Sequence, residues 1–230
     1  MLEENNKLQF QKFLDYFRKE WKQGQHVAIV GPTGRGKTTL ASYLLDIRDY
    51  VVVLAVKRDD DTLYHFRKRG YKTIKKWPPS SGVTKIVYWV RPKSIDHIDL
   101  QASRIHEALD EFYMQGGWCV YIDEVGYVSG HLKQSRPIGV LLNQGRSSNL
   151  SIVCSMTRPR STVASIPVET LSQCRHLFFF KYKDIREIET CAEIAGISKK
   201  DMIYLMNSMS EFDFIYMSDK GHALIQAIRS

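Results

Sequence analysis

The residues best suited to chemistry form a glycine-rich segment, Gly31-Pro-Thr-Gly-Arg-Gly-Lys37-Thr38. It matches the pattern G-x-x-x-x-G-K-[ST] in full, follows an apolar run and precedes an amphipathic one. Glycines let successive backbone N–H groups turn toward a phosphate, and a helix start adds partial positive charge. Lys37 would neutralise phosphate oxygens, and Thr38 would offer its hydroxyl to Mg²⁺. We therefore expect a nucleotide site made of Gly31, Pro32, Thr33, Gly34, Arg35, Gly36, Lys37, Thr38 and Thr39.

Two carboxylates supply the other half of the expected site. An apolar run at 119–122 ends in Asp123 and Glu124. Two adjacent acids beside a buried strand are costly unless a cation or a proton compensates them. Asp123 would hold Mg²⁺ through water, and Glu124 would orient the water that attacks the terminal phosphate. The pattern predicts an ATPase that uses ATP and Mg²⁺; Glu124 as an acid of a surface loop is the alternative.

Strands and helices are expected to alternate around these residues. Stripes of apolar residues at helical spacing lie between apolar runs that predict buried strands at 27–30, 50–56, 85–90, 118–122, 151–155 and 176–180. A strand, loop, helix and strand within about thirty residues make a βαβ unit. Residues 57–82 are polar and basic and predict a short helix and a loop. Capping boxes at Asp184 and Ser198 each predict the start of a helix.

The expected fold is α/β, of the RecA or ASCE type of P-loop NTPase, with a mainly parallel central sheet flanked by helices. Residues 5–22 predict an N-terminal amphipathic helix, because a helical stripe consists of Phe10, Leu14, Phe17 and Trp21. Residues 212–217 and 223–228 predict a terminal β-hairpin. We divide the chain into the N-terminal helix, 1–23, packed on the core, and the ATPase domain, 24–230, in which 183–230 form a helical and hairpin extension.

Net charge and composition limit the classes of partner and the cellular location that we expect for this protein. The net charge of +8 over 230 residues favours polyanionic partners, because neutralised phosphates release counterions. The four cysteines form no C-x-x-C pair and are expected as core residues in a reducing cytosol. No apolar stretch approaches the roughly 20 residues that span a bilayer. We therefore expect no signal peptide, no membrane insertion and a cytoplasmic location, in the host cell if the protein is viral.

Further along, the chain resembles the HerA–FtsK superfamily of DNA-pumping ATPases, including viral genome-packaging members. The resemblance covers residues 24–181 and is carried by Gly145-Arg146, by a strand ending in Thr157-Arg158-Pro159, and by residues 167–181. It implies that Thr157 is the polar sensor, where the family usually has glutamine; a hydroxyl can still contact the γ-phosphate or water, with shorter reach.

The same resemblance implies that Arg146 projects into the active site of a neighbouring subunit in a homo-oligomeric ring. A planar cation delivered in trans would neutralise charge on the transferring phosphoryl group. Arg146 as a cap of its helix C-terminus is the alternative, and Arg158 and Arg160 are alternative candidates for the trans arginine. Arg35, inside the phosphate loop, is interpreted as solvated, with a catalytic role as the alternative.

The expected DNA contacts lie after the carboxylates. In the ring motors that the chain resembles, the loop after that strand faces the central channel, and here it carries Lys133 and Arg136. Glycines would make the loop mobile and the two cations would hold phosphates, although an ordinary polar connection is the alternative. The basic run at 67–76, interleaved with aromatic residues, fits nucleic acid or a solvated face about equally.

The leading hypothesis is an ATP-driven translocase of double-stranded DNA that contacts DNA without sequence preference. It would package viral or plasmid genomes, with a viral portal or capsid vertex as a possible partner. The second hypothesis is an ATPase of the same fold that moves protein, in filamentous-phage assembly or secretion. The third is a nucleotide-dependent switch with little turnover, against which Glu124 argues.

Overall fold

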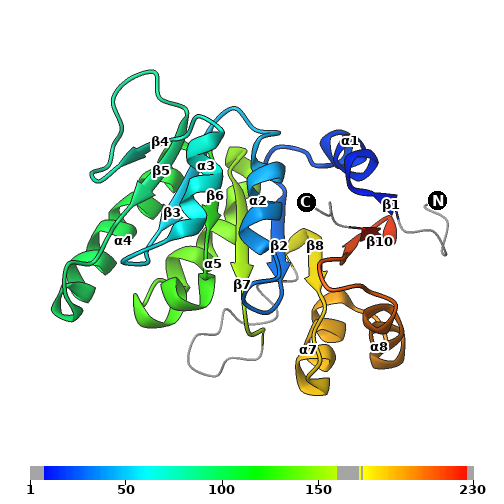
Figure 1. The fold of residues 1–230 in the computed structure, drawn as a ribbon. Helices are drawn as coiled ribbons and strands as arrows, with labels where there is room; N and C mark the ends of the chain where they lie inside the picture. The colour runs from blue at the N-terminus through cyan, green and yellow to red at the C-terminus, as the bar shows by residue number, and fades with distance from the viewer. Residues whose placement is uncertain (1–7, 160–170, 172, 227–230) are drawn as a thin grey trace.

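A ten-stranded sheet forms the centre of the computed structural model, which describes residues 8–159, 171 and 173–226 (Figure 1). The order across the sheet is β1-β10-β9-β8-β2-β7-β6-β3-β5-β4. The strands are β1 (Leu8–Gln9), β2 (His26–Val30), β3 (Val51–Ala55), β4 (Lys72–Ile74), β5 (Lys85–Trp89), β6 (Cys119–Ile122), β7 (Ser151–Met156), β8 (Cys174–Phe180), β9 (Phe214–Ser218) and β10 (Gly221–Gln226). The helices are α1 (Phe10–Glu20), α2 (Lys37–Leu45), α3 (Tyr64–Lys68), α4 (Ile98–Gln115), α5 (Ser135–Gln144), α7 (Ile185–Ala195) and α8 (Lys199–Asn207). Single helical turns are η1 (Asp61–Leu63), η2 (Ile95–His97), η3 (Tyr127–His131) and η4 (Gly145–Ser148).

The central strands are parallel, so their carboxyl ends lie along one edge of the sheet. Each neighbouring pair from β8 through β2, β7, β6, β3 and β5 to β4 is parallel. Every residue of β2, β3, β6 and β7 is buried, as expected for strands covered on both faces. The predicted α/β fold with a mainly parallel sheet is confirmed.

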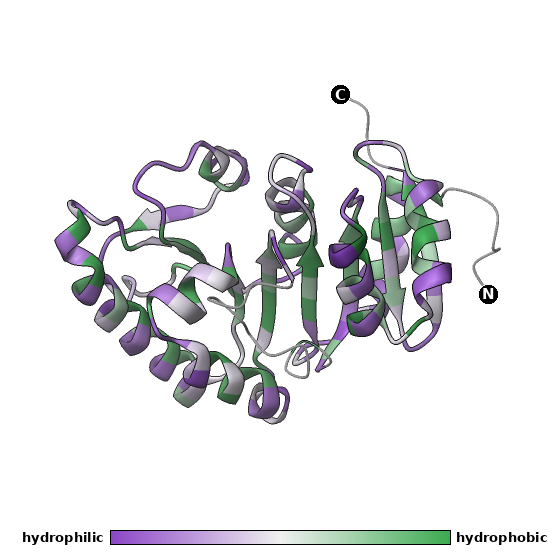
Figure 2. Cartoon of the chain, turned by 90° about the horizontal axis from the view of Figure 1, so that it is seen from below, coloured by the Kyte–Doolittle hydropathy of each residue, from purple (hydrophilic) through white to green (hydrophobic). Residues whose placement is uncertain are grey.

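Helices cover both faces of the sheet and divide the core into two clusters. One cluster joins α1, α2 and α3 to one face, and the other joins α4, α5, α7 and α8 to the opposite face. Successive residues of a strand alternate between them, as Val27 and Ala28 do in β2. Figure 2 shows hydrophobic colour along the strands and hydrophilic stripes on the helices. All four cysteines are buried free thiols, as expected.

The N-terminal helix is shorter than predicted but packs as predicted. It begins at Phe10 and ends at Glu20, not at 5 and 22, and residues 1–7 lie outside the described part. All four residues of the predicted stripe are buried, in the same cluster as one face of β2. The predicted hairpin is confirmed as β9 and β10, with residues 227–228 outside the described part. It extends the main sheet because β9 pairs antiparallel with β8.

The basic segment at 57–82 contains one strand that the sequence did not predict. The expected short helix is α3, but Lys72–Ile74 form β4 and pair in parallel with β5 at the edge of the sheet. Three residues are too few to show an alternating pattern. A short edge strand that carries an exposed lysine resists pairing with other chains.

Two helices begin where the capping boxes predicted. The Asp184 side chain accepts a hydrogen bond from the backbone N–H of Arg186 at the start of α7. The Ser198 hydroxyl accepts one from the backbone N–H of Asp201 at the start of α8. Each bond satisfies a backbone donor that has no partner inside the helix.

Candidate active site

The glycine-rich segment connects the end of β2 to the start of α2. Gly34 and Gly36 have φ angles of +78° and +91°, which side chains with a Cβ rarely adopt. A Cβ on Gly31 would lie 2.6 Å from Cβ of Phe180 in β8. Beside Gly34 and Gly36, the exposed and half-buried residues of the loop are Pro32, Thr33, Arg35, Thr38 and Thr39. The loop therefore depends on glycine at three positions and places the N-terminus of α2 at the carboxyl edge of the sheet (Figure 1).

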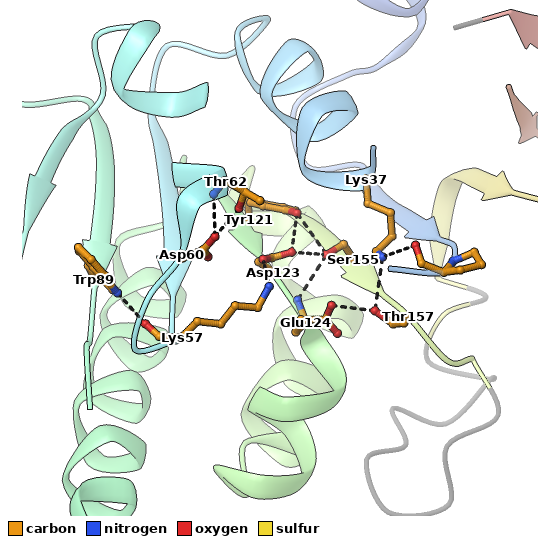
Figure 3. A network of polar contacts seen from close by, with 11 residues as sticks. Lys37, Lys57, Asp60, Thr62, Trp89, Tyr121, Asp123, Glu124, Ser155 and Thr157 are labelled. Atoms are coloured by element: carbon orange, nitrogen blue, oxygen red, sulfur yellow. Dashed lines mark hydrogen bonds and ion pairs between the residues drawn. The ribbon is translucent and has the colours of Figure 1, made fainter. Parts of the chain in front are cut away.

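Lys37, the first residue of α2, is buried and folds over the loop. Its Nζ donates to the Pro32 carbonyl at 3.1 Å and lies 3.4 Å from the Thr157 hydroxyl (Figure 3). Burial lowers the pKa of Lys37, although the carboxylates of Glu124 and Asp123 oppose that shift. The ammonium group thus lies inside the curl of the loop, beside two acids, where a phosphate oxygen could replace its present partners.

Asp123 follows β6, is buried, and has partners on both carboxylate oxygens. Its Oδ1 accepts hydrogen bonds from the hydroxyls of Tyr121, at 2.9 Å, and Ser155, at 2.8 Å. Its Oδ2 forms an ion pair with Lys57 Nζ at 3.1 Å (Figure 3). Burial alone would lower the pKa of Lys57, but the carboxylates of Asp123, Asp60 and Glu124 together outweigh burial and raise it. A buried carboxylate with three partners is held in one orientation.

Glu124 and Thr157 contact each other from neighbouring strand ends. Glu124 has a φ of +52°, a left-handed conformation that is unfavourable for a residue with a Cβ. Its Oε1 accepts a hydrogen bond from the Thr157 hydroxyl at 2.7 Å. The Thr157 carbonyl in turn accepts one from the Tyr182 hydroxyl at 2.7 Å. Thr157 therefore lies between Glu124 and Lys37.

The donor set between α2 and β6 fits Mg²⁺. The Thr38 side chain lies near enough to the Tyr121 hydroxyl to act on its pKa, and that hydroxyl donates a hydrogen bond to Asp123 Oδ1. Thr38 and Asp123, the two predicted metal ligands, are therefore separated by one shared partner. A hydroxyl and a carboxylate are the hard oxygen donors that Mg²⁺ prefers, with water and phosphate oxygens completing the shell.

Sequence reasoning missed four residues of this network. These residues belong to no common sequence motif. They are Lys57, Tyr121, Ser155 and Tyr182. Two signals were present in the sequence. Ser155 is a hydroxyl within an apolar strand, and Tyr121 lies two residues before Asp123, on the same side of β6. Lys57 and Tyr182 carried no local signal.

The predicted trans arginine lies far from the phosphate loop of its own chain. Arg146 is in η4, before β7, and is exposed. Its carbonyl would lie 2.9 Å from a Cβ on Gly24, just before β2. Arg146 is thus at the amino edge of the sheet, and its side chain makes no hydrogen bond or ion pair within the described residues. Arg158, an alternative, is exposed beside Thr157, and Arg160 lies outside the described part.

The structure differs from the sequence prediction in the segment after Glu124 and at Arg35. The segment after Glu124 is mainly helical, with η3 leading into α5, so it is more ordered than the mobile loop expected. Lys133 and Arg136 are both exposed there, Arg136 within α5 itself. Arg35 forms an ion pair with Glu211 at 2.5 Å, which is more than the solvated state expected for it.

The order of the strands and the similarity to solved structures show that the chain has the fold of a P-loop ATPase. No protein-family model matches the chain, and no curated protein matches its sequence. Solved structures match its fold, so the predicted resemblance to packaging-type HerA–FtsK ATPases is confirmed at the level of the fold.

Three similar structures illustrate the match. The DNA-packaging ATPase B204 of Sulfolobus turreted icosahedral virus has 16% identity and a TM-score of 0.61, with 91% of this chain and 100% of that chain covered. The genome-packaging NTPase B204 of Sulfolobus turreted icosahedral virus 2, in complex with AMPPCP, has 14% identity and a TM-score of 0.61, with 90% and 100% covered. VirB4 of Thermoanaerobacter pseudethanolicus has 9% identity and a TM-score of 0.66, with 89% of each chain covered.

Proposed function

We propose that this chain is a Mg²⁺-dependent ATPase that translocates double-stranded DNA as a homo-oligomeric ring. One observation carries the proposal: Lys37, Glu124 and Thr157 meet at the ends of three neighbouring parallel strands, beside Asp123. Ligands of parallel α/β sheets bind at the carboxyl ends of the strands. Lys37 and Asp123 are 86 residues apart in sequence, yet they face one site.

Each residue has a distinct role in the proposed reaction. Backbone N–H groups of the loop and the Lys37 ammonium bind the β- and γ-phosphates. Glu124 orients the attacking water, and its bond to Thr157 holds the carboxylate in place. Mg²⁺, held by Thr38 and Asp123, would neutralise phosphate charge when bound. Thr157 would sense the γ-phosphate, because its hydroxyl lies within reach of both Lys37 and Glu124.

DNA as the translocated substrate is supported by charge and by the fold. The chain has a net charge of +8, and two of the similar structures are described as packaging a genome or DNA. Lys133 and Arg136 are exposed and free to contact a phosphate backbone. No helix in the described ranges is long and apolar enough to cross a membrane.

An ATPase that acts on protein is the second candidate. The cytoplasmic domain of the Type VII secretion ATPase EccC from Thermomonospora curvata also matches the fold, at 10% identity and a TM-score of 0.55, with 90% of this chain and 25% of that chain covered. A nucleotide switch with little turnover is disfavoured by Glu124, since a switch has no need of a water-orienting carboxylate.

Steady-state ATP hydrolysis with and without duplex DNA tests the proposal. We expect Mg²⁺-dependent turnover that DNA stimulates regardless of sequence, and loss of turnover in Glu124→Gln. Turnover that DNA leaves unchanged would favour the protein-acting candidate. Nucleotide binding without any turnover, in the presence or absence of DNA, would favour the switch.

A further inference from the structure

The two oxygens of the Asp123 carboxylate have different environments. Oδ1 accepts from two buried hydroxyls, those of Tyr121 and Ser155. Tyr121 is fully buried and Ser155 is too, so neither can leave without disturbing the core. Among the residues that the structure describes, Oδ2 has one partner, the ammonium of Lys57. A metal bound by Asp123, directly or through water, must therefore approach Oδ2.

Lys57 is anchored through its backbone, and its side chain, which carries the ammonium paired with Asp123, is partly exposed to solvent. It lies two residues beyond β3, and its carbonyl accepts a hydrogen bond from the indole N–H of Trp89 at 2.8 Å (Figure 3). Its side chain is 43% exposed, whereas that of Asp123 is 8% exposed. A lysine side chain is flexible and carries a compact charge. The Lys57 ammonium can therefore move into solvent while Asp123 stays in place.

The two ammonium groups of the site already offset its carboxylates in part. Lys57 interacts with the carboxylates of Asp123, Asp60 and Glu124, and Lys37 interacts with those of Glu124 and Asp123. A divalent cation that entered alone would meet both ammonium groups and would have to displace one of them from Oδ2. The same cation arriving with a nucleotide would bring its own anionic oxygens.

We propose that Lys57 is a displaceable counter-ion that occupies the metal-facing oxygen of Asp123 and keeps the metal subsite closed until a divalent cation arrives with nucleotide. The inference rests on the proposed ATPase function and assigns Lys57 a positioning role in it. Lys57 makes metal binding and nucleotide binding depend on each other. Each ligand lowers the free-energy cost that the other meets when the Lys57 ammonium is displaced from Asp123.

Binding of Mn²⁺ in the absence of nucleotide tests this, with free Mn²⁺ followed by electron paramagnetic resonance. Lys57→Met removes the charge and keeps the length of the side chain. We expect it to bind Mn²⁺ about tenfold more tightly than the wild type, the order expected when a like charge in contact with the ligand is removed. Lys57→Arg should bind as weakly as the wild type. Addition of a non-hydrolysable ATP analogue should strengthen Mn²⁺ binding more in the wild type than in Lys57→Met.

A matched control separates this contact from general electrostatics. Lys93 is an exposed lysine that lines a neighbouring hollow of about 320 Å³ with Arg58 and Tyr127. Lys93→Met changes the net charge by the same amount and should leave Mn²⁺ affinity unchanged. Asp123→Asn added to Lys57→Met should abolish the gain.

The inference is overturned if Lys57→Met binds Mn²⁺ no more tightly than the wild type, or if Lys93→Met gives the same gain. Should Lys57→Met fail to fold, Lys57→Gln is read by the same criteria. Failure of the ATPase proposal would appear separately, as a wild-type chain that binds no ATP at any Mg²⁺ concentration.

Discussion

Replacement of Arg146 by alanine tests whether the active enzyme is an oligomer. Arg146 precedes β7, whereas the phosphate loop adjoins the other end of that strand, where the Gly31 N–H donates to the Met156 carbonyl at 3.1 Å. The six residues of β7 span about 20 Å at roughly 3.3 Å each. An arginine side chain is far shorter than that. Arg146 therefore cannot reach nucleotide on its own chain, and a catalytic role requires a neighbouring subunit.

The expected loss is large if Arg146 acts in trans. Removing an arginine that stabilises the transferring phosphoryl group lowers the rate about 10³–10⁵-fold, which corresponds to about 4–7 kcal/mol of transition-state stabilisation. If Arg146 only caps the C-terminus of α5, its loss costs about 0.3–1 kcal/mol of folding stability and leaves turnover intact. Steady-state ATPase activity and thermal unfolding distinguish the two roles. Arg18→Ala, which removes an exposed arginine in α1, is the matched control.

Mixing subunits gives the decisive measurement. Arg146→Ala and Glu124→Gln chains are each expected to be inactive alone. In an equal mixture, about a quarter of the head-to-tail interfaces pair an intact Glu124 with an intact Arg146, so up to about a quarter of wild-type activity should return if sites act independently. Mixtures that co-assemble on native mass spectrometry and stay inactive would refute the trans role. Specific activity that stays constant on dilution to the monomer would refute the oligomer as well.

Three further predictions follow from the site, the surface and the core. Lys37→Ala should abolish ATP binding, because Lys37 neutralises phosphate charge, whereas Glu124→Gln should bind ATP and not hydrolyse it, because Glu124 acts on the attacking water. Equal ATP affinity in the wild type and Lys37→Ala, measured by calorimetry, would contradict this. Lys133→Ala with Arg136→Ala should flatten the slope of log K for DNA against log salt, and an unchanged slope in binding titrations would remove these residues from the DNA path. Burial lowers the pKa of His26 to about 4 in the folded chain, below the ordinary value of about 6.5. Below pH 6.5 the unfolded chain binds a proton at this histidine that the folded chain does not. About 2–3 kcal/mol of the free energy of unfolding is therefore present above pH 6.5 and is lost as the pH falls toward 4. Thermal midpoints measured from pH 7 to pH 4 should therefore drop more in the wild type than in His26→Asn, and parallel curves would contradict the assignment.

Much of the fold could be predicted because its signals are local. The apolar runs of β2, β3, β6 and β7 are continuous, and only strands covered on both faces need such runs. The capping serine and aspartate marked the starts of α7 and α8 within a residue. β4 was missed because a three-residue edge strand needs little apolar character, since its pairing with β5 supplies most of its stability.

The sequence alone was enough to predict nucleotide chemistry, since the residues proposed to bind phosphate are consecutive and so are the two carboxylates. The backbone conformation of the phosphate loop is also encoded locally, because it requires glycines at positive φ angles and a helix that starts directly after them. How the two motifs meet depends on the order of the strands in the folded sheet. The order β2-β7-β6-β3 places Thr157 between Lys37 and Glu124 and brings Lys57 onto Asp123, across 66 residues of chain. Strand order arises from packing helices onto both faces of the sheet, a non-local free energy that no short stretch of sequence contains.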